Sequence, residues 1–164
     1  MGGTIIYLDS NGMHRQDITE LLQPFGLVVP FPTEQSFREV MDAYKAMPHG
    51  GGLWPKLFVL EQRVAWAEPD PHRVQAPPEV LEGGSTLAGT RCYDYLRQVE
   101  TGLHLPPSPV IVYHDEDVPD IETALGARGI SLEDANVRVL EKNYHTKPHE
   151  LLDLVRRLLQ QQPR

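Results

Sequence analysis

Two acidic side chains each follow a short apolar run of the sequence. Asp9 comes directly after the run at residues 4–8, and Glu61 comes directly after the run at residues 57–60. Carboxylates can bind a hard divalent cation such as Mg²⁺ or take part in phosphoryl transfer, but both roles need several such groups at one place. Asp9 and Glu61 are therefore the candidate metal ligands, provided that the fold brings them together.

Three further polar residues hold comparable positions. Ser10 follows Asp9, His114 follows the apolar run at residues 109–113, and Lys142 lies two residues after the run at residues 137–140. If the apolar runs are parallel strands of one sheet, their carboxyl ends lie at the same edge, where ligands of such sheets bind. The sequence then predicts an acidic cluster with one lysine, gathered from separate segments of the chain.

Apolar runs and helical periodicities alternate along the chain, as strand followed by helix, five times. This alternation predicts an α/β fold in which a five-stranded parallel sheet of the flavodoxin-like, doubly wound kind carries helices on both faces. Pro30 predicts that the second strand lies at an edge of the sheet, and Thr33 is the predicted N-cap of the second helix. The predicted strands cover residues 4–8, 27–31, 57–60, 109–113 and 137–140.

A single domain over residues 1–164 is expected, with a frayed tail at residues 160–164. Residues 63–84 contain four prolines and show no clear period, so they are predicted to form a long inserted loop after the third strand. Trp66 lies in this segment. It is either an anchor for a binding partner or a side chain that folds back to fix the loop, and the sequence leaves both readings open.

The composition sets limits on the function. With 15 basic and 23 acidic residues, the net charge is −8, which disfavours binding to nucleic acid. Cys92 is the only cysteine, so a disulfide within the chain is excluded, and it lies on an apolar helical face that predicts burial. We find neither an apolar run that could span a bilayer nor a secretory signal, and we expect a cytoplasmic protein without membrane contact.

The order and spacing of these motifs resemble the receiver domains of bacterial response regulators. Residues 5–11 resemble the first strand of that family, which ends in two adjacent acids. Residues 57–61 resemble the third strand, which ends in the phosphoacceptor aspartate, and residues 109–114 resemble the fourth, which ends in Thr or Ser. The resemblance covers nearly the whole chain apart from residues 63–84, and it implies a role in two-component signalling or a phosphorelay.

Three pocket positions depart from the family pattern. Ser10 replaces the second acid, which removes a charge from the place where the family holds Mg²⁺. Glu61 stands at the acceptor position with a carboxylate one methylene further out, and His114 replaces the small hydroxyl residue. These departures characterise an atypical member, or pseudo-receiver. Glu61 is then either a mimic of a phosphorylated aspartate or an acid tolerated in a pocket that no longer works.

The pocket lysine has two candidates. Lys142 closely follows the predicted fifth strand, whereas Lys147 lies in a stretch that reads like the aromatic-x-x-Lys-Pro motif of the family. We favour Lys142, because strand periodicity is the stronger physical signal, and an ion pair between Glu61 and Lys142 is expected.

The predicted function is that of a stand-alone pseudo-receiver that is not an enzyme, needs no cofactor and acts by binding a signalling protein. The resemblance places the docking surface on residues 121–129, 137–140 and 151–159, and the long loop at residues 63–84 is a second candidate surface. The predicted contact residues are Trp66, Ile121, Val139 and Tyr144. One alternative is a Mg²⁺-dependent phosphoacceptor, another is a small-ligand sensor at the strand ends, and homodimer formation is left open.

Overall fold

The computed structural model describes residues 3–47, 54–69, 75–115, 121–133, 136–142 and 148–161. Its centre is a five-stranded sheet in the order β2-β1-β3-β4-β5, in which each neighbouring pair is parallel. This is the predicted flavodoxin-like topology, and β2 with its proline lies at an edge as expected. The strands are β1 (Thr4–Leu8), β2 (Leu27–Phe31), β3 (Leu57–Glu61), β4 (Val110–His114) and β5 (Val137–Glu141).

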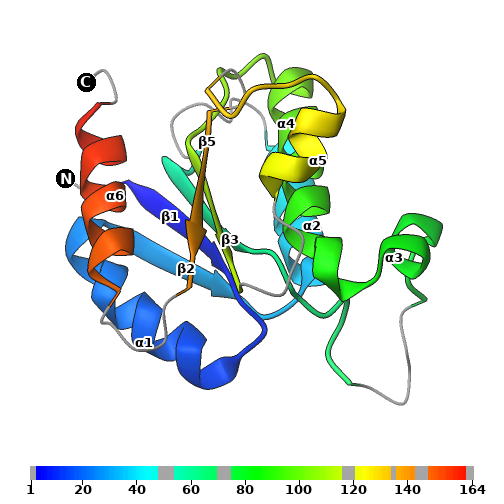
Figure 1. The fold of residues 1–164 in the computed structure, drawn as a ribbon, viewed down its shortest axis with the longest axis horizontal. Helices are drawn as coiled ribbons and strands as arrows, with labels where there is room; N and C mark the ends of the chain where they lie inside the picture. The colour runs from blue at the N-terminus through cyan, green and yellow to red at the C-terminus, as the bar shows by residue number, and fades with distance from the viewer. Residues whose placement is uncertain are drawn as a thin grey trace.

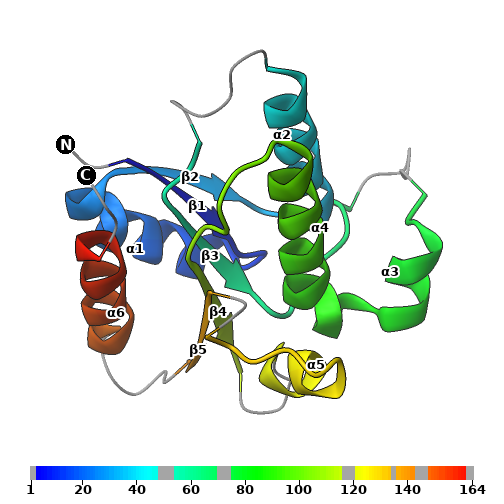
Figure 2. The same ribbon diagram turned by 90° about the horizontal axis from the view of Figure 1, so that it is seen from above.

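The helices cover both faces of this sheet, as Figures 1 and 2 show. Figure 2 shows α1 and α6 on one side of the sheet, and α2, α4 and α5 on the other. Within the described residues, no helix is long and apolar enough to cross a membrane. The bounds are α1 (Gly12–Leu22), α2 (Glu34–Ala46), α4 (Ala88–Gly102), α5 (Ile121–Ala127) and α6 (His149–Gln160).

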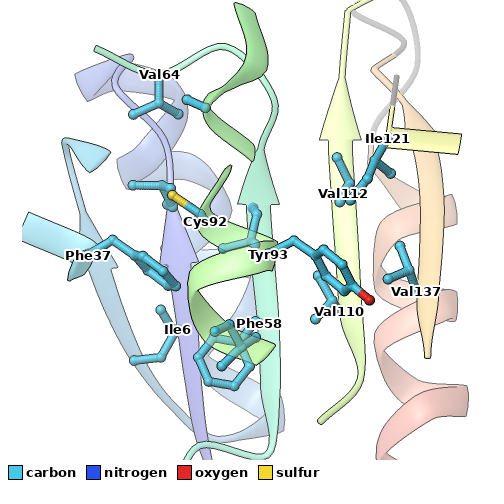
Figure 3. Packing of buried hydrophobic residues seen from close by; sticks show 14 of the residues in the cluster. Ile6, Phe37, Phe58, Val64, Cys92, Tyr93, Val110, Val112, Ile121 and Val137 are labelled. Carbon is cyan, nitrogen blue, oxygen red and sulfur yellow. The ribbon is translucent and has the colours of Figure 1, made fainter. Parts of the chain in front are cut away.

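Successive side chains of each strand point to opposite faces of the sheet, so the hydrophobic core has two parts, one on each face. Ile6 of β1 and Phe58 of β3 face α2 and α4, where they pack with Phe37 and Cys92 (Figure 3). Side chains of the opposite parity, such as Tyr7, pack against α1 and α6. Every residue of β3 is buried, as a central parallel strand requires. Cys92 is fully buried as predicted, and burial raises the pKa of its thiol well above the ordinary value.

Side-chain caps fix where two helices begin. The Asn11 side chain accepts a hydrogen bond from the backbone amide of His14 at 3.2 Å, which starts α1 directly after the β1 loop. Thr33 caps α2 as predicted, and it forms a capping box with Ser36. The short β1–α1 connection matters for the site, because it places the first turn of α1 beside Asp9.

Residues 63–84 were predicted to form a long loop without regular structure, but they contain a helix, so that prediction is wrong for the end of the segment. Helix α3 spans Pro78–Gly83, followed by a 3-10 turn at Ser85–Leu87. Pro78 occupies the first helical turn, where a missing N–H costs nothing, and Val80 is buried, which gives the helix one apolar anchor. Figures 1 and 2 show that α3 projects from the domain beside α2 and α4.

The inserted segment is fastened to the start of α2. The carbonyl oxygens of Ala65 and Trp66 accept hydrogen bonds from the amides of Glu34 and Gln35 at 3.0 and 2.9 Å. The Arg38 guanidinium lies 5.2 Å from the centre of the Trp66 ring, close enough for a cation–π contact. Trp66 thus folds back onto the domain, which is one of the two readings that the sequence left open.

A buried ion network holds the same region together. The Glu34 carboxylate is fully buried and accepts hydrogen bonds from Arg38 at 2.8 Å and from Arg91 at 2.9 and 2.8 Å. Arg38 also contacts Glu79 of α3 at 2.9 Å, and Arg91 donates to the carbonyl of Gly84 at 2.8 Å. One carboxylate therefore links α2, α4 and the inserted segment.

Candidate functional site

Asp9, Glu61 and Lys142 meet at the carboxyl edge of the sheet, as the sequence predicted. They follow or end β1, β3 and β5, and their exposed fractions are 1%, 3% and 8%. The Lys142 ammonium forms an ion pair with Glu61, and its Nζ lies 3.7 Å from Oδ2 of Asp9. The expected Glu61–Lys142 pair is therefore present, and the lysine occupies the space between the two carboxylates.

Lys142 reaches this position across the end of β4. Its backbone amide donates to the carbonyl of His114 at 2.7 Å, which extends the β4–β5 pairing by one residue. Its Nζ lies 5.2 Å from the centre of the Tyr113 ring. The ring is thus close enough for a cation–π contact with the buried ammonium group. Lys147, the alternative candidate, lies outside the described residues.

Asp9 is held by three donors besides the lysine. The Tyr7 hydroxyl donates to Oδ2 at 2.6 Å, the Asn11 amide donates to Oδ1 at 2.8 Å, and Nδ1 of His14 contacts Oδ2. Burial by itself would raise the pKa of Asp9. The hydrogen bond with His14, the charge of Lys142 and the hydrogen bonds from Tyr7 and Asn11 outweigh it and hold the pKa below the ordinary value. Asp9 is therefore an ionised, fixed acceptor.

Burial also changes the neighbouring groups. It lowers the pKa of Lys142, and the negative charge of Asp9 counteracts this only in part. Burial first, and then the charge of Asp9 and its hydrogen bond, raise the pKa of the Tyr7 hydroxyl, which remains protonated and donates to the carboxylate. The site is thus a compact arrangement in which internal donors and one internal cation satisfy the acids.

His14 and Tyr7 were not predicted as site residues from the sequence. Both contact Asp9, and the His14 side chain is 21% exposed, so it borders the site on the solvent side. A signal for His14 was present: Asn11 is a strong N-cap residue, and a helix that starts beside it puts His14 within its first turn. Tyr7 looked like an ordinary strand residue, because its aromatic ring packs in the core.

Gly89 explains how tightly α4 approaches the end of β3. A Cβ at this position would lie 2.4 Å from Oε1 of Gln62 and 2.9 Å from the carbonyl oxygen of Glu61. The amide of Gly89 donates to the carbonyl of Gln62 at 3.1 Å, which joins the start of the helix to the chain directly after Glu61. The start of α4 therefore packs directly against the backbone that carries Glu61.

The remaining predicted site residues lie elsewhere or apart from the cluster. Ser10 is exposed. His114 is buried at the end of β4, and its Nδ1 donates to the carbonyl of Asp115 at 2.9 Å. Ile121, predicted as a contact residue, is fully buried and packs in the core below α5, so that prediction is corrected. Val139 is partly exposed on β5, and Tyr144 lies outside the described residues.

The Mg²⁺ site that the receiver resemblance implies does not fit these residues. Mg²⁺ requires a near-octahedral shell of oxygen ligands. Here the Lys142 ammonium pairs with Glu61, Nδ1 of His14 contacts Asp9, and Ser10 carries no charge at the position of the second acid. The internal partners of the two carboxylates therefore leave too few free oxygens for the shell that Mg²⁺ requires.

Comparisons with solved structures define the class of fold. No protein-family model and no curated protein sequence matches the chain. The structure is similar to a response regulator receiver protein from Sinorhizobium medicae, with a TM-score of 0.60, 16% identity, and coverage of 98% of this chain and 96% of the other. A receiver domain protein from Clostridium thermocellum gives a TM-score of 0.56 at 14% identity, with coverage of 96% and 94%.

The DrrB receiver domain is also similar, with a TM-score of 0.55 and 19% identity over 98% of this chain and all of the other. Similarity at these identities establishes the fold alone. The chain therefore has the fold of a response-regulator receiver domain, with the strand order that this fold requires.

Proposed function

We propose that this chain is a signalling module of the receiver type that acts by binding another protein and does not need phosphorylation of Glu61. One observation carries the proposal: the acidic edge is occupied by an internal cation. The Lys142 ammonium pairs with Glu61 and lies 3.7 Å from Asp9, and all three groups are buried. The position at which a phosphodonor would have to approach Glu61 is filled by the chain itself.

The chemistry of Glu61 supports the same conclusion. Phosphoryl transfer depends on in-line positioning and on charge neutralisation by a metal ion. Glu61 is 3% exposed and paired, and the residues around it do not fit Mg²⁺. The buried ion pair with Lys142 instead holds Glu61 in one position. A domain whose site does not change in this way would present the same binding surface at all times. We therefore propose that the chain is not an enzyme.

The docking face that we propose includes β5. This strand is an edge of the sheet, and Val139 on it is only partly buried, although it also packs against the core on the side of α2 and α4. The strand also ends at Lys142, so the face is continuous with the closed site. Helix α3 is a second candidate surface, because Leu81 on it is 69% exposed. The phosphoacceptor alternative keeps one supporting observation, the meeting of Asp9, Glu61 and Lys142.

A small-ligand sensor has less support. A pocket of about 620 Å³ lies at the opposite, amino-terminal edge of the sheet, where Trp54, Lys56 and Asn136 are among its lining residues. The carboxyl edge, where the sensor alternative places its ligand, is packed with the ion pairs described above. We therefore keep protein binding as the proposed function.

Affinity capture from the source cells tests the proposal. We expect the immobilised chain to capture the same protein with and without pretreatment with a small phosphodonor and Mg²⁺. Val139→Arg should abolish the capture, and Leu27→Arg, at the exposed position on the opposite edge strand, should not. Capture that requires the phosphodonor would contradict phosphorylation independence, and capture unaffected by Val139→Arg would exclude β5. Loss in Leu81→Arg alone would move the docking surface to α3.

A further inference from the structure

A pocket opens at the amino-terminal edge of the sheet, on the side opposite to the ion-paired site. Its volume is about 620 Å³, within the range of cavities that bind a small organic molecule. The segments that precede β3, β4 and β5 form most of its lining, and these three strands are neighbours in the sheet. The end of α6 contributes the remaining residues. The pocket therefore lies where several regular elements converge.

The walls of the pocket are mostly apolar. Four prolines, Leu105 and Leu158 line it together with the ring of Trp54. The Trp54 ring is held by its neighbours, because its centre lies 5.2 Å from that of Tyr44 and 6.0 Å from that of Phe58. Proline rings have no N–H group and a fixed φ angle. Such walls need little ordering when a planar apolar ring packs against them, which favours binding.

Ser108 is a firmly held polar group in this lining. It is 7% exposed, its amide donates to Oε1 of Glu100 at 2.8 Å, and its carbonyl accepts from Arg97 at 2.9 Å. Its hydroxyl oxygen accepts a hydrogen bond from Nε1 of Trp54 at 2.8 Å. Within the part of the chain that the structure describes, no acceptor takes the proton of this hydroxyl. Buried hydroxyl groups usually donate as well, so Ser108 offers a hydrogen-bond donor to a molecule in the pocket.

The charges around the pocket favour an anion. Nδ2 of Asn136 donates to the carbonyl of Pro107 at 2.9 Å, which holds the carboxamide at the pocket and leaves its second N–H for a ligand. Lys56 adds a positive charge to the lining. None of the described lining residues is acidic, although the whole chain has a net charge of −8. An anionic group placed here therefore meets donors and a cation without a competing carboxylate.

We propose that this pocket binds a small aromatic carboxylate. The planar ring packs against Trp54 and the prolines, and the carboxylate accepts hydrogen bonds from Ser108 and Asn136 beside the charge of Lys56. The apolar walls select the ring, and the donors select the acid. The site lies at the opposite end of the strands from the position that the sensor alternative assumes. The proposal goes beyond protein binding and does not depend on it.

Proton–nitrogen correlation spectra of the isotope-labelled full chain, recorded during titration with 2-naphthylacetate, test the proposal. The chain has two tryptophans, and the indole N–H of Trp54 lies at the pocket. Trp66 packs near Arg38 and is the internal control. We expect a saturable shift of the Trp54 signal, with a Kd in the millimolar range or tighter, and none of the Trp66 signal. The uncharged 2-(2-naphthyl)ethanol should bind at least about fivefold more weakly.

Two substitutions test the polar groups, and a third is the matched control. Ser108→Ala should weaken the binding of 2-naphthylacetate at least about fivefold and leave that of the alcohol nearly unchanged. If Ser108→Ala does not fold, because Trp54 loses a buried acceptor, Lys56→Gln at an exposed position provides the test and should weaken the acid about threefold. Lys45→Gln, at an exposed position of α2 outside the pocket, should bind like the wild type.

Three results would overturn the proposal. The first is equal affinity for the acid and the alcohol, or no saturable shift of the Trp54 signal. The second is equal weakening in Lys45→Gln and Lys56→Gln, which would reduce the effect to net charge. The third is a shift of the Trp54 signal that depends on protein concentration without ligand, which would assign the pocket to a second copy of the chain. These readouts are independent of the capture experiment, so either proposal can fail while the other stands.

Discussion

The ion pair between Lys142 and Glu61 offers the sharpest test of how the site is built. Replacement of Lys142 by methionine keeps most of the length of the side chain and removes its charge. The Glu61 carboxylate, 3% exposed, then has no cation beside it, and Asp9 loses the one that lies 3.7 Å away. At that separation, two unit charges in surroundings with an effective dielectric constant of about 20 interact by about 4 kcal/mol.

The net cost of the substitution should be similar. Removal of one partner from a buried ion pair costs about 3–5 kcal/mol, because the remaining charge is desolvated and unpaired. We therefore expect Lys142→Met to lower the free energy of unfolding by about 3–5 kcal/mol, a large part of the roughly 5–15 kcal/mol typical of a domain. Urea denaturation followed by far-ultraviolet circular dichroism measures this loss at neutral pH.

The matched control removes both charges. In the double variant Glu61→Gln/Lys142→Met, no buried charge is left unpaired between β3 and β5, so most of the lost stability should return and the double variant should lie within about 2 kcal/mol of the wild type. A loss below about 1 kcal/mol in Lys142→Met would show that the pair behaves as an exposed one. Additive losses in the double variant would show that the two groups do not interact, and either result would refute the closed site.

Three further predictions concern the scaffold and Asp9. Glu34→Gln should lower the free energy of unfolding by about 3 kcal/mol, because the guanidinium groups of Arg38 and Arg91 lose their buried anion. Glu79→Gln, at a side chain 53% exposed, should lower it by less than about 1 kcal/mol. Urea denaturation compares the two variants, and equal losses would contradict the buried network. Leu96→Ala should cost about 2–5 kcal/mol in the same assay, and a smaller loss would indicate that the fully buried side chain is poorly packed. Because the pKa of Asp9 is lowered in the folded protein, the ionised carboxylate stabilises the fold above the ordinary pKa of 3.8, and this stabilisation is lost as the pH falls through the pKa of the folded state. The difference in the free energy of unfolding between the wild type and Asp9→Asn should therefore shrink below about pH 4. A difference that stays constant with pH would contradict a lowered pKa of Asp9.

The fold could be predicted from the sequence because several local signals agreed. Apolar runs set the five strands, Pro30 marked an edge, and Thr33 marked the start of α2. Each signal depends on neighbouring residues only. Helix α3 was missed because its six residues are too short for a period, and its position depends on contacts with distant residues such as Arg38.

Part of the site could also be predicted from the sequence. The carboxyl ends of parallel strands meet at one edge, so Asp9, Glu61 and Lys142 could be placed together from topology. His14 and Tyr7 could not, because their contacts with Asp9 depend on the entry angle of α1 and on the direction of a side chain within the core. The predicted contact residue Ile121 was wrong, since helical periodicity shows that a residue belongs to an apolar face but not that the face is covered.

We propose that the acidic edge is closed by its own lysine and accepts no phosphoryl group. Intact mass spectrometry after incubation with acetyl phosphate and Mg²⁺ tests it most directly. The mass of the wild-type chain should be unchanged and should equal that expected from its sequence. A stable increase of one phosphoryl group that disappears in Glu61→Ala would contradict the account and identify a working phosphoacceptor.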